Sequence, residues 1–409
     1  MTEKKKNIPE LRFPEFEGEW VKIKIRELST KITDGTHDTP KVTETGIPYL
    51  TAIHIKDGFI DYDNCYYLDI ETHKKIFSRC NPEFNDILMV NIGAGTATTA
   101  LNKVNYEFSL KNVALIKLDK TKSDSHFLVH IQRFNTHKLF NRITSGGAQP
   151  FLSLKEIGKI SHYFPSLPEQ QKIASFLTSV DERIQQLTKK KELLEKYKKG
   201  IMQKIFSQQI RFKDDDGNDF PDWEEKRLGE VSKFRRGSFP QPYGMPEWYS
   251  EDGLPFVQVF DVDNNMKLKK VTKQRISQKA QPNSVFAEKG SIVLTIQGSI
   301  GRIAITQYDA YIDRTLLLFT DFFIPLVKEF FMYSVFLLFE REKIKAPGGT
   351  IKTITKEELT QFSLKIPLRN EQQKIADFLS SIDKKIEAVE VQLEKTKAFK
   401  KGLLQKMFV

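Results

Sequence analysis

One short polar phrase occurs twice in this chain, and this repeat constrains the fold more than any other feature of the sequence. The residues EQQKIASFL begin at Glu169, and EQQKIADFL begins 202 positions later at Glu371, about half of the 409-residue chain away. Aligned without gaps, residues 168–206 and 370–408 share 18 identities in 39 positions. A repeat at such a spacing indicates that one structural unit has been duplicated.

The duplication extends beyond the repeated phrase, but it becomes faint between the two copies. GIPYL at 46–50 corresponds to GLPFV at 253–257, and DILMVNIGAGTAT at 86–98 corresponds to SIVLTIQGSIGRI at 291–303. The long repeated segments are therefore retained as a frame, while the residues between them have diverged. Two equal copies would perform one task twice, whereas a retained frame with divergent contents indicates one task carried out on two different targets.

Each repeated segment is predicted to be a long helix, because its seam positions follow alternating steps of four and three residues. They are Ile173, Leu177, Val180, Ile184, Leu187, Lys191, Leu194, Lys198, Ile201 and Ile205 in the first copy, and Ile375, Leu379, Ile382, Ile386, Val389, Leu393, Thr396, Lys400, Leu403 and Met407 in the second. About 39 residues at about 1.5 Å each give a rod of roughly 58 Å. Ser166 to Glu169 has the pattern of a capping box, and Asn370 is expected to cap the second helix.

The two long helices are expected to pair with each other as an antiparallel coiled coil. One seam has Lys191 where the other has Leu393, so a parallel homodimer would bury lysines against themselves. An antiparallel pair within the chain lets each lysine stem lie along apolar side chains with its ammonium group in water. The alternative is that each helix packs separately on its own domain.

Outside the long helices, the sequence predicts two globular modules of an α+β (mixed α/β) fold. Short apolar runs such as NVALIKL and TLLLFTDF are typical of strands, and Gly, Pro and Asn turns separate them. The expected organisation is an N-terminal segment 1–19, a first module 20–165, a first long helix 166–207, a linker 208–222, a second module 223–366 and a second long helix 367–409.

Composition narrows the class of function. Lys and Arg outnumber Asp and Glu by 64 to 53, and the net charge of +11 favours a polyanionic partner such as nucleic acid. Cys65 and Cys80 form no disulfide or zinc pattern and the N-terminal residues contain no apolar signal region, so we expect a cytoplasmic protein. The most apolar stretch, 322–339, contains Pro325 and Lys328 and is expected to be a buried helix.

Short strings that suggest catalysis lack the residues that the chemistry needs. NPEF at 81–84 resembles the adenine-binding loop of amino-methyltransferases without its second proline, and no glycine-rich loop for S-adenosylmethionine accompanies it. PDWEEK at 221–226 places its acidic residues too close together for a Mg²⁺ nuclease site. His126 and His130 lack the Glu of a zinc-protease helix. We therefore expect no catalytic, cofactor or metal site in this chain. The alternative functions are a stand-alone methyltransferase or nuclease, or a coiled-coil scaffold.

The repeated frame, the divergent modules and the paired helices together resemble the specificity subunit of type I restriction–modification systems. The motifs that carry the resemblance are LPEQQKIASFLTSVDERI at 167–184, its copy at 368–386, and the opening PDWEEKRLGEV at 221–231. The resemblance implies a non-catalytic subunit whose two target recognition domains each read half of a split, asymmetric DNA site, while the paired helices set the gap. It also implies docking of two methylation and two restriction subunits, with S-adenosylmethionine, ATP and Mg bound by those partners.

The same resemblance places partner docking at the start of each long helix. The docking residues expected from it are Glu169, Gln170, Gln171 and Phe176 in the first copy and Glu371, Gln372, Gln373 and Phe378 in the second. The second copy begins with Asn370 where the first has Pro168, which is a minor departure between the copies.

DNA contacts are expected from glycine-rich loops with polar side chains, because base edges are read by polar groups inserted in a groove and phosphates are bound by basic and hydroxyl groups. The candidates in the first module are Thr36, His37, Thr39, Lys41, Thr96 and Gln149. Those in the second module are Arg235, Arg236, Ser238, Gln297, Ser299, Arg302, Thr350 and Lys352. The alternative for each loop is an ordinary turn without a DNA contact.

Overall fold

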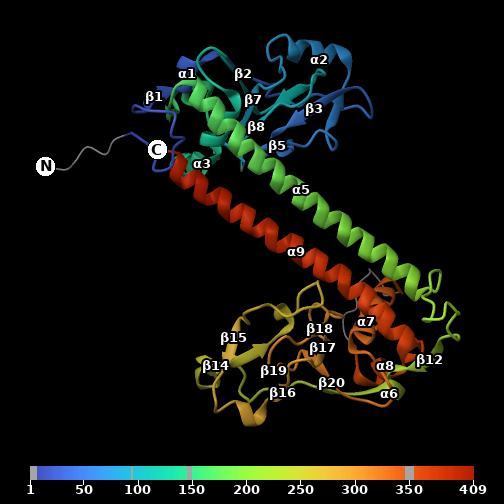
Figure 1. Ribbon diagram of the computed structural model, residues 1–409. Helices are drawn as coiled ribbons and strands as arrows, with labels where there is room; N and C mark the ends of the chain where they lie inside the picture. The colour runs from blue at the N-terminus through green and yellow to red at the C-terminus, as the bar shows by residue number, and fades with distance from the viewer. Residues whose placement is uncertain (1–6, 94, 145–149, 346–353) are drawn as a thin grey trace. The chain divides into compact units, whose positions relative to one another are not determined.

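The computed structural model describes residues 7–93, 95–144, 150–345 and 354–409. It divides into two compact units, of which unit 1 comprises residues 1–189 and 390–409 and unit 2 comprises residues 190–389. Each long helix therefore contributes one part to each unit (Figure 1). No helix in the described ranges is both long enough and apolar enough to cross a membrane.

Unit 1 contains a mixed α+β module. Its strands are β1 (Val21–Lys24), β2 (Ser29–Asp34), β3 (Ile47–Thr51), β4 (Ile55–Lys56), β5 (Phe59–Ile60), β6 (Tyr66–Leu68), β7 (Ile87–Val90), β8 (Thr99–Leu101), β9 (Ser109–Lys111), β10 (Val113–Leu118) and β11 (Ser161–Phe164). Its helices are α1 (Ile25–Leu28), α2 (Ile70–Phe77), α3 (Ser125–Thr144) and α4 (Leu154–Lys159), with one 3-10 turn, η1 (Ala52–His54).

The centre of unit 1 is an antiparallel sheet in the order β2-β10-β7-β8. The predicted strand NVALIKL forms β10, with a neighbour on each side. Side chains alternate across a strand, so Ala114 and Ile116 enter one hydrophobic core while Val113 and Leu115 enter another. Unit 1 also contains a smaller sheet in the order β6-β3-β9, in which β3 runs parallel to β9.

Unit 2 repeats this plan. Its strands are β12 (Glu224–Arg227), β13 (Ser232–Arg236), β14 (Tyr249–Val257), β15 (Gln274–Ile276), β16 (Val285–Ala287), β17 (Ile292–Thr295), β18 (Ile303–Ile305), β19 (Ala310–Ile312), β20 (Leu316–Phe322) and β21 (Ser363–Ile366), and its shorter helices are α6 (Leu228–Val231), α7 (Lys328–Lys345) and α8 (Lys356–Gln361), with the 3-10 turns η2 (Pro246–Trp248), η3 (Val259–Asp261) and η4 (Gln281–Asn283). The sheet order β13-β20-β17-β18 matches β2-β10-β7-β8, and the pair β12-β21 matches β1-β11. The duplication that is faint in the sequence is clear in the order of these strands.

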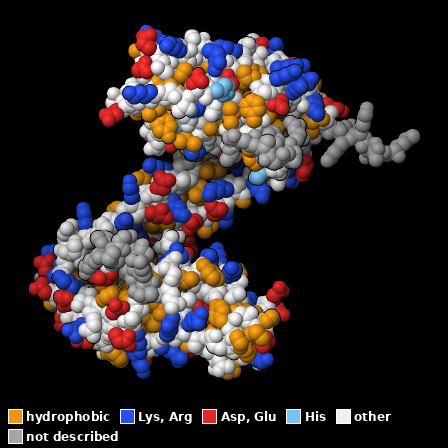
Figure 2. Space-filling model, turned by 180° about the vertical axis from the view of Figure 1, so that it is seen from behind, with side chains coloured by type: hydrophobic (Ala, Val, Ile, Leu, Met, Phe, Trp, Pro, Cys, Tyr) orange, Lys and Arg blue, Asp and Glu red, His pale blue; other side chains and the backbone are white. Residues whose placement is uncertain are grey.

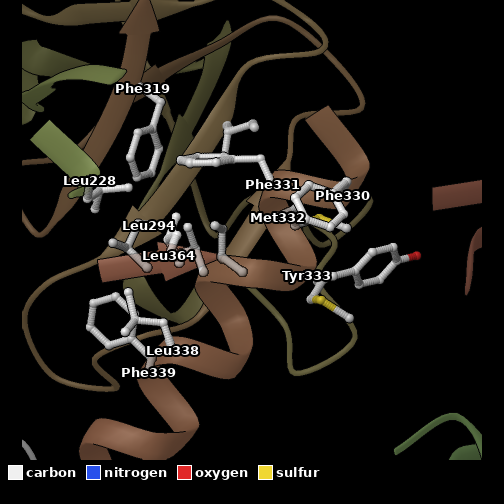
Figure 3. Packing of buried hydrophobic residues seen from close by; sticks show 14 of the residues in the cluster. Leu228, Leu294, Phe319, Phe330, Phe331, Met332, Tyr333, Leu338, Phe339 and Leu364 are labelled. Carbon is white, nitrogen blue, oxygen red and sulfur yellow. The ribbon is translucent and has the colours of Figure 1, made fainter. Parts of the chain in front are cut away.

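The most apolar stretch of the sequence ends in α7, which is buried as expected. Phe330, Phe331 and Phe339 are fully buried in the main core of unit 2. Figure 3 shows Phe331 beside Phe319 of β20, and their ring centroids lie 5.1 Å apart in an edge-to-face arrangement. The same core includes Ile375 of the second long helix, so α7 joins the central sheet to that helix.

The long helices are α5 (Leu167–Phe206) and α9 (Arg369–Met407), and they pack antiparallel as predicted. In unit 1 the start of α5, including Leu177, shares a core with Leu403 and Met407 near the end of α9. In unit 2 the end of α5, including Ile205, shares a core with Leu379 near the start of α9. The alternative of two separately packed helices is therefore wrong.

The predicted helix caps differ from the observed ones. Because α9 begins at Arg369, Asn370 lies inside the first turn and does not cap the helix. The carboxylate of Glu169 accepts hydrogen bonds from the Arg12 and Trp20 side chains instead of forming a capping box with Ser166.

Two lysines of the seam end in ion pairs and not in water, which corrects the expectation for their ammonium groups. In unit 1 Lys400 Nζ lies 2.5 Å from Asp181 Oδ1, and in unit 2 Lys198 Nζ lies 2.6 Å from Asp383 Oδ1. Burial lowers the pKa of both amines, and the partner carboxylate opposes this shift. Because the two lysine side chains are buried between the helices, each ammonium group is paired with an aspartate and is not solvated by water.

Candidate nucleic-acid interface

In unit 1, loops from distant parts of the sequence converge at one end of the central sheet. Since neighbouring strands are antiparallel, β2 and β7 end where β8 and β10 begin. The loop 35–41 follows β2, residues 91–93 and 95–98 lie between β7 and β8, and Asn112 forms the short turn between β9 and β10. Two of the predicted DNA-contacting loops therefore lie together with a turn that was not predicted.

Backbone hydrogen bonds hold this cluster of loops together. Asn112 N–H donates to the carbonyl of Thr36 at 3.2 Å, and Leu152 N–H donates to the carbonyl of Asn91 at 2.8 Å. The second bond brings the segment after α3 to the same end of the sheet. The cluster is thus tied to the sheet through its backbone, which leaves side chains available for contacts.

Unit 2 has an equivalent cluster of loops. The loop 237–243 follows β13, the loop 296–302 lies between β17 and β18, and the turn 313–315 precedes β20. Ile296 N–H donates to the carbonyl of Thr315 at 2.9 Å, and Gly237 N–H donates to that of Leu316 at 2.9 Å. In both units, therefore, the predicted loops lie at the equivalent end of the equivalent central sheet.

A glycine begins the first loop of each cluster because the backbone approaches closely there. A Cβ atom at Gly35 would lie 1.9 Å from the carbonyl oxygen of Leu110, and one at Gly237 would lie 2.2 Å from that of Asp313. Any other residue would push the loop off the neighbouring strand. The glycine in both copies fixes where each loop leaves the sheet.

The side chains at this end of unit 1 are polar and largely oriented by one another. His37 Nε2 lies 2.8 Å from Asp34 Oδ2, and its Nδ1 lies 3.1 Å from Asn112 Oδ1. The Lys111 ammonium donates to Thr39 Oγ1. Arg79, from the segment after α2, donates to the carbonyl of Gly35 and its side chain remains 58% exposed. The sheet end thus offers amide, imidazole and cationic groups to a ligand.

The corresponding side chains of unit 2 are different. Arg235 and Arg236 are exposed at the end of β13, and the Arg314 guanidinium lies over the Tyr243 ring, 5.2 Å from its centroid. Tyr243 Oη donates to Asp313 Oδ2 at 3.3 Å and accepts a hydrogen bond from Gln258 Nε2 at 2.6 Å. Burial and the nearby Asp313 charge raise the pKa of Tyr243, so its hydroxyl stays protonated. Unit 2 therefore presents arginines where unit 1 presents His37 and Asn112.

The predicted DNA-contacting residues are not equally accessible. Thr96 is 1% exposed and its hydroxyl donates to the Gly93 carbonyl, so its side chain stabilises the loop and is not presented on the surface. Ser238 and Arg302 are half-buried and donate to the carbonyls of Asn283 and Val262. The exposed candidates are His37, Thr39, Lys41, Arg235, Arg236, Gln297 and Ser299, and Thr36 is half-buried. Gln149, Thr350 and Lys352 lie outside the described residues.

Some residues at these sheet ends were missed from the sequence. Asn112 and Arg314 belong to short turns before apolar strands, and Lys111 ends the strand β9 just before one of these turns. An Asn or charged residue at such a turn is a weak signal that was available. Arg79 follows α2 and reaches the cluster only through the tertiary fold, so no local pattern indicates it.

The surface charge alone does not mark the interface. Figure 2 shows Lys and Arg side chains spread over the visible face of both units and mixed with Asp and Glu. Within the described ranges, no group of three or more His, Cys, Asp or Glu side chains is placed to hold a metal ion. The histidine pair on α3 is structural: His130 is buried, its Nε2 lies 3.2 Å from Thr178 Oγ1, and burial lowers its pKa to about 3.

The repeated EQQ phrase proves to be an internal anchor in each unit. In unit 1, Glu169 accepts from Arg12 and from Trp20 Nε1, and in unit 2, Glu371 accepts from Arg211 and from Trp223 Nε1. Each Glu therefore ties the segment just before the first strand of its module to the start of a long helix. Both carboxylates are at most 1% exposed.

The glutamine that follows each of these glutamates is also internal. Gln170 Oε1 accepts from Ser123 and from the backbone N–H of Asp124, and Gln372 Oε1 accepts from the N–H of Val327. These contacts hold the chain just before α3 and α7. Glu169, Gln170, Glu371 and Gln372, which the sequence prediction gave as docking residues, are buried and hydrogen-bonded within their own units, and their side chains are not presented on the surface of the chain.

The remaining predicted docking residues have intermediate or high exposure. Phe176 is half-buried against Phe13, with ring centroids 5.9 Å apart, and Phe378 is half-buried against Phe212 at 5.7 Å. Gln171 and Gln373 are exposed. Farther along the helices, the equivalent aromatic residues Tyr197 and Phe399 are 53% and 54% exposed, and the sequence prediction missed both.

Comparison with known proteins identifies the family to which these two units belong. The model of the type I restriction modification DNA specificity domain matches this chain twice, at residues 17–196 and 221–396. The two matches fall on the two halves of the internal repeat and cover most of the chain. The chain belongs to the type I restriction modification DNA specificity family. The resemblance inferred from the repeated motifs is thereby confirmed.

Two relatives match most of the length of this specificity protein. A Methanocaldococcus jannaschii protein named as the specificity subunit of the type I restriction enzyme MjaX is 24% identical over 414 residues, covering 98% of this chain and 95% of the relative. The MjaVIII specificity subunit of the same organism is 26% identical over 381 residues, covering 87% and 84%.

Solved structures share the fold. The crystal structure of a type I restriction-modification system S subunit from M. genitalium matches with a TM-score of 0.66 at 18% identity, covering 98% of this chain and 99% of that one. A structure described under complex assembly and conformational transition of the type I R-M system matches with a TM-score of 0.53 at 19% identity, covering 95% and 96%. The tandem α+β architecture with two long helices is therefore that of the family.

Proposed function

We propose that this DNA specificity subunit reads a bipartite, asymmetric site, with one half-site bound by each module. The observation that supports this proposal is the pair of equivalent sheet ends, whose backbone frame recurs while the side chains differ. A shared frame binds the DNA backbone in the same way, since phosphate contacts set position, and different side chains meet different base edges. Unit 1 offers His37 and Asn112, whereas unit 2 offers Arg235 and Arg314.

The paired helices set the number of unread base pairs between the half-sites. Both α5 and α9 run through each unit's core, so a change in helix length changes the separation of the two sheet ends. A coiled coil suits this task because its length is proportional to residue number, at about 1.5 Å per residue.

The subunit directs methylation and restriction subunits to the site that it reads. Two copies of the methylation subunit dock on the long helices, one near Tyr197 and one near Phe399. These two aromatic side chains occupy equivalent positions of the repeat and are more than half exposed, as is typical of anchors in protein interfaces. Gln171 and Gln373 remain candidates at the rim of the same surfaces.

Catalysis belongs to the partners in this proposal. The methylation subunits bind S-adenosylmethionine and modify adenine, and two restriction subunits bind ATP and Mg. This chain supplies DNA recognition and assembly. The complex works in the cytoplasm, where the DNA lies.

A salt titration of DNA binding tests the interface. Replacing Arg235 and Arg236 by Ala should weaken binding of the full chain to duplex DNA and reduce the slope of log K against log salt by about 0.9 for each phosphate that these side chains neutralise in the wild type. The matched control replaces Lys384 and Lys385, two exposed cations on α9, by Ala. Equal effects of the two double variants would show that the sheet end is not the DNA interface.

Native mass spectrometry of the assembled complex tests the docking sites. Tyr197→Ala and Phe399→Ala should each lose one methylation subunit, and the double variant should lose both. Glu182→Ala, an exposed change on α5, serves as the control and should leave the stoichiometry unchanged. Retention of two methylation subunits by the double variant would contradict the proposed sites.

A further inference from the structure

The turn before β10 in unit 1 and the turn before β20 in unit 2 lie in the middle of their loop clusters. β10 has β2 on one side and β7 on the other, and β20 has β13 and β17. The turn before β10 is therefore flanked by the loops that follow β2 and β7, and the turn before β20 by the loops that follow β13 and β17. In unit 1 this turn is the single residue Asn112, which separates β9 from β10, and in unit 2 it consists of residues 313–315.

In unit 2 this turn holds an exposed arginine in a prepared orientation. The Arg314 guanidinium lies 5.2 Å from the centroid of the Tyr243 ring, and the Tyr243 hydroxyl is itself held by Asp313 and Gln258. Within the described residues, the Arg314 guanidinium has no hydrogen-bond acceptor, whereas Arg236 donates to a backbone carbonyl. A stacked guanidinium with free N–H groups loses little freedom on binding.

In unit 1 the same place holds an oriented amide. Asn112 lies between β9 and β10 with a positive φ of 54°, and its Oδ1 lies 3.1 Å from His37 Nδ1. His37 is in turn held by Asp34 at 2.8 Å. The two modules therefore use the same arrangement, in which a loop side chain orients a turn side chain, with different residue types.

We propose that this turn is a base-reading element in both modules and that Arg314 reads a guanine in the half-site of the second module. The inference rests on the proposed function. An arginine fork matches the O6 and N7 acceptors of guanine, and an asparagine amide matches the N6 donor and N7 acceptor of adenine in the major groove. The change from Asn112 to Arg314 is then one cause of the difference between the half-sites.

The test compares adenine methylation patterns directed by variants of the full chain assembled with its methylation subunit. Arg314→Ala should reduce the preference for guanine at one position of one half-site by about 10- to 100-fold, and the other half-site and the gap should stay unchanged. Asn112→Ala should relax one position of the opposite half-site. Lys289→Ala is the matched control, because Lys289 is exposed at the opposite end of β17 and should leave the motif intact.

The possible outcomes separate the two proposals. If wild type directs methylation of no split motif, the proposed function fails. If wild type directs a split motif and Arg314→Ala retains the same bases at full stringency, this inference alone fails. Should Arg314→Ala abolish methylation altogether, Arg314→Lys decides, because it keeps the charge and loses the fork. A motif relaxed at one guanine by Arg314→Lys supports the inference, and an unchanged motif overturns it.

Discussion

At the residue scale, the same buried arrangement of a glutamate, an arginine and a tryptophan occurs once in each unit. Glu371 Oε2 lies 2.8 Å from Arg211 Nη2 and 3.1 Å from Trp223 Nε1. A buried carboxylate is unfavourable unless all its partners are present, so these three side chains depend on one another. The repeated phrase therefore contributes to the stability of each unit.

Removing this charge should destabilise unit 2. Glu371→Gln leaves Arg211 with a neutral partner, and we expect the free energy of unfolding to fall by about 2–3 kcal/mol. Urea unfolding of the full chain measures the change. Glu225→Gln, on the exposed β12, should change it by no more than about 0.5 kcal/mol. Equal losses for both variants would contradict the internal role of Glu371.

His162 should make unit 1 sensitive to acid. Burial lowers its pKa to about 4, while the unfolded value is about 6.5. Between these pH values the unfolded chain binds a proton at His162 that the folded chain does not bind. The free energy of unfolding is therefore unaffected by His162 above about pH 6.5 and falls as the pH drops towards about 4. From pH 7.5 to pH 5 the loss due to this residue should be about 2 kcal/mol.

The control for this prediction is His162→Gln, which does not titrate and keeps a side-chain donor for Gln132 Oε1. Its free energy of unfolding should fall by about 2 kcal/mol less than that of wild type over the same pH interval. The same pH dependence in both proteins would show that His162 is not the titrating group.

At the element scale, the two long helices are held together by equivalent buried ion pairs. Lys198 pairs with Asp383, which also accepts a hydrogen bond from Tyr333 Oη at 2.6 Å, and Lys400 pairs with Asp181. A slide of one helix along the other would leave these charges buried without partners. We expect these pairs to contribute little net stability and to select one register of the two helices.

This role predicts a contrast between two sets of changes at the same place. Asp383→Asn should cost about 3 kcal/mol in unfolding free energy, since it leaves the buried Lys198 unpaired. Replacing the pair together, with Lys198→Met and Asp383→Leu, should be nearly neutral. Chemical unfolding measures both proteins, and a large loss in the double variant would contradict the assignment of the pair to register.

The elements were predictable from the sequence where the signal is local. The seam from Ile173 to Ile205 and the buried strand β10 follow from spacing and runs of apolar residues, and the structure has both. The role of Glu169 was not predictable, because its partners Arg12 and Trp20 lie 157 and 149 positions away. For the same reason the loops at the sheet end were identified in part, while Arg79 was missed.

At the scale of the whole molecule, the duplicated frame explains how one chain can carry two different readers. The order of the central strands is the same in both units, so the sheet ends are equivalent. The side chains placed there differ, and the helices that join the units are regular. Recognition and spacing can therefore change independently of each other.

Independent spacing gives a prediction about helix length. Inserting one heptad after Leu187 in α5 and one after the equivalent Val389 in α9 keeps the seam and adds about 10.5 Å. The gap should lengthen by roughly 3 base pairs at about 3.4 Å each, and both half-sites should stay the same. Methylated-motif sequencing reads the gap, and an unchanged gap would refute the ruler function of the helices.

The central claim is that this chain alone determines which split DNA sequence its complex modifies. The most direct measurement is single-molecule sequencing of modified adenines in cells that contain the methylation subunit with and without this chain. We predict one bipartite, asymmetric motif with a fixed gap that is present only with this chain. The same methylation pattern with and without it, or a continuous motif, would contradict the claim.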